Sequence, residues 1–126
     1  MREIILVFFG AGFGGVMRFI LGSLVYSVTG RNFPYGTLVI NLTGSFIMGF
    51  LFVIITHKYA NLAPYLIAFM LVGILGGYTT FSSFSIETLR LFQDEKIAFA
   101  FTNILVSTTG GILLAWVGYI LAQKLV

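Results

Sequence analysis

A stretch of glycines, hydroxyl side chains and aromatic rings between Gly73 and Glu87 carries the residue types best suited to binding a small ion. Its glycines and the pair Thr79 and Thr80 occur inside a long apolar segment. Glycine lowers helix stability, and hydroxyl groups compete for the hydrogen bonds of the backbone. We therefore predict a membrane helix that is interrupted at about residues 76–80.

Two phenylalanines and the serines beside them follow the predicted interruption. Phe81 and Phe84 are three residues apart, so both rings lie on one face of a resumed helix. Ser82 and Ser83 lie between them. A broken helix at membrane depth leaves peptide groups without partners, and such breaks persist where the backbone binds an ion, lines water or is buried in protein. The stretch therefore predicts a site for a small ion.

The composition is that of an all-α integral membrane protein. The chain has 126 residues, of which 59% are hydrophobic and 9% are charged, whereas soluble domains contain about 25% charged residues. A spanning helix needs about 20 apolar residues, so the chain can hold about four. The absence of cysteine excludes disulfides, and the scattered basic residues form no nucleic-acid patch. We expect one four-helix domain with spans at residues 4–26, 37–56, 64–92 and 97–122.

The first expected span contains a glycine pair and a charge. Gly10, Gly14 and Arg18 fall at steps of four and share a helix face. The glycine spacing favours close packing of helices. A guanidinium this deep in a span is unfavourable unless it faces protein, water or an anion. Arg18 therefore either extends outward to the membrane surface or helps to form a vestibule that attracts anions.

Polar residues also follow one face of the second and fourth spans. Asn41 lies in the middle of the second span, where its amide either forms an interhelical hydrogen bond or directs an N–H at an ion. The spacing alone favours the interhelical bond. In the fourth span, Asn103, Ser107 and Gly111 form a polar seam that faces protein or a pore. Glu87 and Arg90 are three residues apart, and we expect them to pair at the membrane interface.

The basic residues give the chain no preferred orientation in a membrane. Four spans place Arg2, Lys58 and Lys124 on one side and Arg31, Arg90 and Lys96 on the other. With three basic residues on each side, the positive-inside rule favours neither orientation, so the chain can insert both ways. We expect two oppositely oriented copies to form an antiparallel dual-topology homodimer, in which the two interruptions meet and their carbonyls hold a cation.

Three sequence motifs resemble those of one known family. The motifs are Gly12-Phe13-Gly14-Gly15-Val16-Met17-Arg18-Phe19, Gly36-Thr37-Leu38-Val39-Ile40-Asn41-Leu42-Thr43-Gly44-Ser45-Phe46 and Gly76-Gly77-Tyr78-Thr79-Thr80-Phe81-Ser82-Ser83-Phe84-Ser85-Ile86-Glu87. Together they resemble the Fluc/CrcB fluoride channels, and the resemblance extends over nearly the whole chain. It implies a dual-topology homodimer with two antiparallel fluoride pores.

The resemblance also implies roles for individual residues. A structural sodium ion on the dimer axis would be held by the backbone carbonyls of Gly76 and Thr79. The fluoride pathway would contain Arg18, Thr37, Asn41, Phe81, Ser82, Ser83, Phe84 and Ser107. Gly111 offers no hydroxyl where some members of the family have one.

The resemblance implies passive export of fluoride from the cytoplasm across the inner (plasma) membrane, and the residues suit passive movement of this ion. Fluoride holds water tightly, and amide, hydroxyl and aromatic-edge hydrogens can replace that hydration without trapping the ion. No ATP-binding loop or nucleophile–base constellation is present, so we expect no enzyme. A dual-topology small multidrug transporter is the alternative, because it has the same layout. Such transporters use a carboxylate inside the first helix, where this chain has only Glu3 at the edge.

Overall fold

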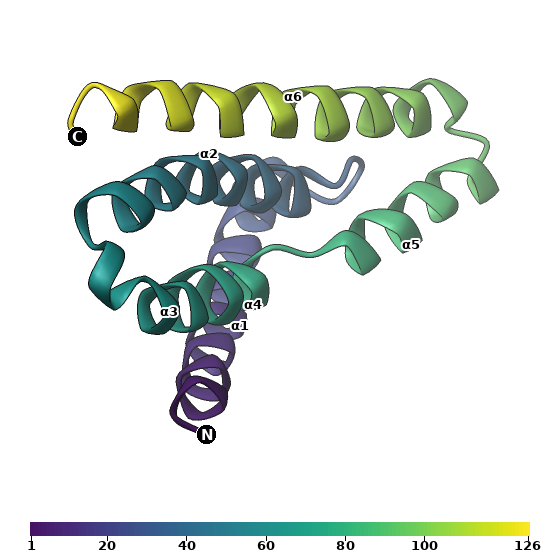
Figure 1. The fold of residues 1–126 in the computed structure, drawn as a ribbon. Helices are drawn as coiled ribbons and strands as arrows, with labels where there is room; N and C mark the ends of the chain where they lie inside the picture. Colours follow the sequence, from purple (N-terminus) through teal and green to yellow (C-terminus); the bar gives the residue numbers. More distant parts are fainter.

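The computed structural model describes all 126 residues, Met1–Val126, and is entirely helical apart from short turns (Figure 1). Four helical segments are long and apolar enough to cross a membrane: α1 (Arg2–Thr29), α2 (Tyr35–Lys58), the segment Ala60–Gln93, and α6 (Ile97–Gln123). The prediction of an all-α membrane protein with four spanning helices is therefore confirmed.

The third segment is built from several shorter helices. It contains η1 (Ala60–Leu62), α3 (Ala63–Leu66), the π-helix η2 (Ile67–Leu75), α4 (Gly76–Tyr78) and α5 (Phe81–Gln93). Only Thr79 and Thr80, with ψ angles of 158° and 118°, adopt an extended backbone between α4 and α5. Gly76 and Gly77, which the sequence placed inside the interruption, remain helical. Sequence reasoning also did not anticipate the π-helix.

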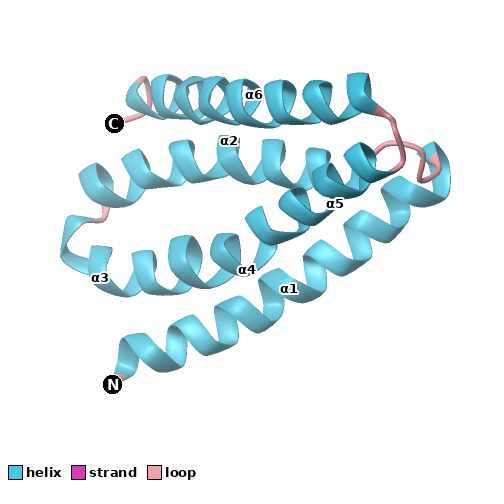
Figure 2. Cartoon of the chain, turned by 90° about the vertical axis from the view of Figure 1, so that its right-hand side faces the viewer, coloured by secondary structure: helices cyan, strands magenta, loops and turns pink.

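The helices run back and forth between two ends of the molecule (Figure 2). The N-terminus, the turn from α2 to η1 and the C-terminus lie at one end, whereas the loop from α1 to α2 and the turn from α5 to α6 lie at the other. Helices α2 and α6 lie side by side along most of their length, and α1 crosses the third segment (Figures 1 and 2). This arrangement surrounds Thr79 and Thr80 with residues of α1 and α2.

Glycines allow the helix backbones to touch at these crossings. In α1, Gly14 lies against the carbonyl oxygen of Ile74, and a methyl group at this position would collide with it. In α6, Gly118 lies in the same way against the carbonyl of Phe46 in α2. The predicted close packing at the glycine pair of the first span is thus confirmed.

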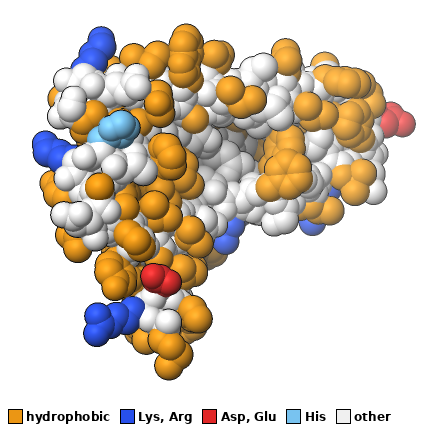
Figure 3. Space-filling view, viewed as in Figure 1, with side chains coloured by type: hydrophobic (Ala, Val, Ile, Leu, Met, Phe, Trp, Pro, Cys, Tyr) orange, Lys and Arg blue, Asp and Glu red, His pale blue; other side chains and the backbone are white.

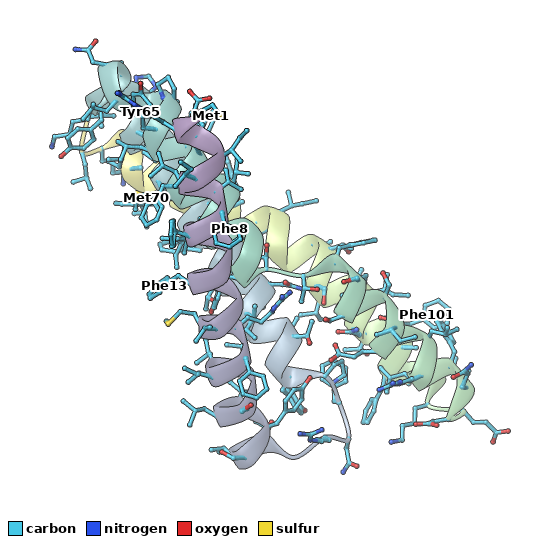
Figure 4. The ribbon with its side chains drawn as sticks, turned by 90° about the horizontal axis from the view of Figure 1, so that it is seen from below. Met1, Phe8, Phe13, Tyr65, Met70 and Phe101 are labelled. Atoms are coloured by element: carbon cyan, nitrogen blue, oxygen red, sulfur yellow. The ribbon has the colours of Figure 1, made fainter.

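Most large apolar side chains lie on the outside of the single chain. The buried cluster contains only Ile40, Ile55, Leu71, Leu75 and Tyr78. Hydrophobic side chains cover much of the face in Figure 3, and charged side chains appear mainly at its edges. Figure 4 shows Phe8 and Phe13 projecting from α1, and these residues are 74% and 57% exposed. Such a surface suits contact with lipid or with a second chain.

Candidate functional site

The side chain of Asn41 supplies the hydrogen bonds that the backbone of Thr80 lacks. In a continuous α-helix, the Thr80 N–H would donate to the carbonyl of Gly76. Here it donates to Asn41 Oδ1 at 2.9 Å, and Asn41 Nδ2 donates to the Thr80 carbonyl at 3.0 Å. Asn41 therefore forms the interhelical bond that its spacing favoured. An amide nitrogen carries two protons, so a second N–H remains for a ligand.

Thr80 also caps the start of the next helix, α5. Its Oγ1 accepts a hydrogen bond from the Ser83 N–H at 3.2 Å, which is the usual arrangement of an N-cap threonine. The same oxygen lies 3.2 Å from Ser82 Oγ and donates to Ser83 Oγ at 3.1 Å. The structure thus gathers Ser82 and Ser83, two expected pathway residues, into the cap of α5.

The two carbonyls expected to bind sodium have lost their helical donors. The Gly76 carbonyl loses the Thr80 N–H to Asn41, and the Thr79 carbonyl loses the Ser83 N–H to Thr80 Oγ1. The Thr79 carbonyl keeps only a long contact of 3.5 Å from Arg18 Nη1. Carbonyl oxygens that have lost their helical donors are suitable ligands for a hard monovalent cation. The residues present therefore fit such an ion.

Arg18 points toward the interruption and not toward the membrane surface. Its Nη1 lies 3.5 Å from the carbonyl oxygen of Thr79, which is long for a hydrogen bond, and the residue is half-buried. This geometry does not agree with outward extension to the membrane surface, and the interpretation that Arg18 helps to form an anion-attracting vestibule stays a prediction. Its charge raises the positive potential beside Thr79 and Thr80.

A cleft of about 290 Å³ opens beside the interruption. It is lined by Asn41, Gly44, Ser45, Met48, Thr79, Thr80, Phe81 and Ala115. None of these residues is acidic. The cleft therefore offers amide, hydroxyl and aromatic-edge hydrogens without a negative charge, and this is a favourable environment for an anion.

The two predicted pathway rings lie side by side on α5. The ring centroids of Phe81 and Phe84 are 5.6 Å apart with an interplanar angle of 43°. Phe81 is 78% exposed, whereas Phe84 is half-buried. The Phe81 ring thus extends from the cleft to the outside of the single chain.

Thr37 lies in a second polar cluster, which centres on Glu87. Glu87 Oε1 accepts hydrogen bonds from Tyr26 Oη at 3.1 Å and from Thr37 Oγ1 at 2.8 Å. Its Oε2 is buried and has no partner within the chain. The expected Glu87–Arg90 pair is not formed, because Glu87 faces α1 and α2 while Arg90 is exposed. In the sequence, this cluster was indicated by Glu87, an acidic residue within the expected span 64–92 that needs polar partners there.

Ser107 lies in a third polar cluster, between α5 and α6. Asn103 is 2% exposed and donates through Nδ2 to Thr88 Oγ1 at 2.9 Å. Thr88 Oγ1 donates to the Phe84 carbonyl at 2.7 Å, and Ser107 Oγ donates to Asn103 Oδ1 at 3.3 Å. The Phe84 carbonyl can only accept, so Thr88 must donate to it and accept from Asn103 Nδ2. Asn103 Oδ1 is therefore left to accept the proton of Ser107.

The expected site residues are therefore divided among three clusters. Arg18, Asn41 and Phe81 meet at the interruption, whereas Thr37 and Ser107 each lie in a separate cluster. Sequence reasoning named Thr80 only as part of the interruption, and it did not single out Tyr26 and Ser45. For the capping role of Thr80, the signal was a threonine directly before the first apolar residue of a helix, Phe81.

Comparison with known proteins gives matches along nearly the whole chain. Residues 5–119 match the family described as "CrcB-like protein, Camphor Resistance (CrcB)". A "Fluoride-specific ion channel FluC" of Coxiella burnetii is 42% identical over 123 residues, covering 98% of this chain and 99% of the relative. Proteins with the same name from Methylococcus capsulatus and Geobacter sp. are 46% and 39% identical and cover 92% and 99% of this chain. The alignments include 50% and 100% of those two relatives.

Proposed function

Because this chain belongs to the CrcB-like family, we propose that it is a fluoride-specific ion channel. The observation that carries the proposal is its identity of about 40% to curated fluoride channels over almost the entire chain. The acid-free cleft beside Thr79 and Thr80 supports the same function. As a member of a family of ion channels, the protein is not an enzyme.

Fluoride is proposed to pass through the cleft by exchanging water for weak protein donors. The spare N–H of Asn41 and the electropositive edge of the Phe81 ring face or border this space. Arg18 attracts the anion from a distance without occupying the cleft. Donors of moderate strength suit a channel, because an ion that binds too tightly does not leave.

The working form is proposed to be an antiparallel dual-topology homodimer, with the third helix of each chain broken within the bilayer. Two observations support this proposal. The N-terminus, the turn that follows Lys58 and the C-terminus lie at one end, so three basic residues flank each end of the molecule (Figure 2). Phe81 also projects outward, where a second chain can complete the pathway.

A structural sodium ion is proposed at the centre of that dimer. The carbonyl oxygens of Gly76 and Thr79 would hold it, since both have lost their helical donors. When bound, the ion would offset the repulsion between carbonyl dipoles of the two chains. Thr80 and Asn41 hold the extended backbone that presents these oxygens.

The channel is proposed to export fluoride from the cytoplasm through the inner (plasma) membrane. Hydrogen fluoride is a weak acid that crosses membranes in its neutral form and dissociates inside a neutral cytoplasm. A passive pathway for the anion then lets fluoride leave down its electrochemical gradient.

A liposome efflux experiment tests this function. Purified protein is reconstituted into liposomes loaded with fluoride, chloride or a lipophilic cation, and protein-free liposomes serve as the control. Fluoride should leave rapidly without ATP, as measured with a fluoride electrode, while chloride and the cation are retained. Efflux of the cation driven by a proton gradient would instead identify the alternative, a small multidrug-type transporter.

A further inference from the structure

Three hydroxyl side chains line the cleft beside the interruption, and the protein itself engages two of them. Thr79 Oγ1 donates to the Leu75 carbonyl at 2.9 Å. Thr80 Oγ1 donates to Ser83 Oγ at 3.1 Å and accepts the Ser83 N–H. The third hydroxyl belongs to Ser45 of α2, and it has no hydrogen-bond partner within the chain.

Ser45 differs in this respect from two threonines of its own helix. Thr43 and Thr56 each donate to the carbonyl four residues earlier, both at 2.7 Å. Helical serines and threonines commonly satisfy their hydroxyl in this way. Because Ser45 does not, its proton is available to a ligand inside the cleft.

Asn41 places a second available donor on the same side of α2. The two residues are four positions apart, so their side chains share a helix face and lie about 6 Å apart along the axis. Asn41 uses one amide proton for the Thr80 carbonyl and retains the other. Two donors without a neighbouring acid form a site for a small hard anion.

Gly111 of helix α6 lies opposite Ser45. A Cβ atom built on Gly111 would lie 3.5 Å from Ser45 Oγ, an ordinary contact distance, and would meet no other atom within 4 Å. Gly111 therefore faces the Ser45 hydroxyl without crowding it. A side chain on Gly111 would lie beside Ser45 Oγ, from the opposite helix.

We propose that Ser45 is a fluoride-contacting residue, whose hydroxyl donates to the ion as it passes between Asn41 and the ring edge of Phe81. The inference rests on the proposed fluoride channel function. Gly111 has no hydroxyl where some members of the family have one, and Ser45 would supply a hydroxyl at the same place. The hydroxyl comes from α2 instead of α6.

The test moves the hydroxyl from one helix to the other. Ser45→Ala should lower fluoride flux in liposomes roughly tenfold or more, because one hydrogen bond to a charged ion is lost. In that background, Gly111→Ser should restore much of the flux, whereas Gly111→Ala, which fills space without a hydroxyl, should not. Thr56→Val is the matched control on α2, since its hydroxyl bonds only to its own helix, and it should conduct normally.

Unchanged flux in Ser45→Ala would overturn the inference. The inference would also be overturned if both Gly111 variants restored fluoride flux to Ser45→Ala, or if neither did. The loss of flux would then be a packing effect and not the loss of a hydroxyl. Fluorine-19 NMR of the protein in nanodiscs, titrated with sodium fluoride, separates this inference from the proposed function. A protein that binds fluoride through Ser45 but does not conduct it would refute only the channel function. No bound fluoride and no flux in the wild type would refute both.

Discussion

The side-chain amide of Asn41 pairs with the peptide groups on both sides of Thr80, 39 positions away in the sequence. Its Nδ2 donates to the Thr80 carbonyl at 3.0 Å, and its Oδ1 accepts the Thr80 N–H at 2.9 Å. This pair of bonds replaces helical bonds that the extended backbone cannot make. It connects α2 to the interruption and leaves one amide proton directed elsewhere.

Asn41→Asp should abolish fluoride flux. The carboxylate can still accept the Thr80 N–H, but it cannot donate to the Thr80 carbonyl, and it adds a negative charge to the acid-free cleft. Flux is measured by liposome efflux, and size-exclusion chromatography checks that the protein remains assembled. Wild-type flux at neutral pH in this variant would remove Asn41 from the pathway.

Phe81→Ile and Phe84→Ile should reduce conduction more than they reduce stability. Each substitution retains an apolar side chain but removes the electropositive ring edge. At least one variant should form a folded protein with greatly reduced fluoride efflux. We would abandon the role of the rings if both variants carried fluoride at the wild-type rate.

Thr88→Val should lower the free energy of unfolding by about 1–3 kcal/mol, because it leaves the buried Asn103 Nδ2 without an acceptor. Thr88→Val combined with Asn103→Leu should be less destabilised than the sum of the two single variants, since both polar partners are then absent. Unfolding in detergent with increasing denaturant measures the three values. Strict additivity would show that the bond between the two side chains is unimportant.

The unmodified protein should insert in both orientations. Three of its seven basic residues lie at each end and Arg18 lies inside a span, so neither direction is favoured. Two lysines added to the loop at residues 29–33 should bias insertion and lower activity, and a copy biased in the opposite direction should restore it. A reporter at the C-terminus that detects only one side of the membrane in the unmodified protein would contradict dual topology.

Prolonged removal of sodium should inactivate the protein or weaken the dimer, without making flux depend on a sodium gradient. The reason is that the carbonyls of Gly76 and Thr79, which have lost their helical donors, would repel their counterparts in the second chain without a cation. Fluoride efflux and the dimer fraction are measured before and after extended dialysis against a buffer free of sodium and lithium. Full flux from a protein whose high-resolution map lacks a central ion would argue against the site.

The sequence by itself determined the class of the protein and its main elements. Four apolar stretches of sufficient length predict four spanning helices, because the hydrocarbon thickness of a membrane fixes the length of a helix that crosses it. The spacing of Gly10 and Gly14 predicted close packing, because residues four apart share a helix face. These properties depend only on local composition and helical periodicity.

The tertiary structure decided which polar groups meet. Local spacing suggested that Glu87 pairs with Arg90, yet its partners are Tyr26 and Thr37, 61 and 50 positions away. The sequence also predicted that Gly76 and Gly77 lie in the interruption, whereas in the structure only Thr79 and Thr80 are extended. Asn41 bonds to Thr80, which lies in the interruption between α4 and α5. Periodicity places a residue on one face of its own helix, but the rotation and crossing of neighbouring helices determine which face it meets, and those depend on packing along the whole chain.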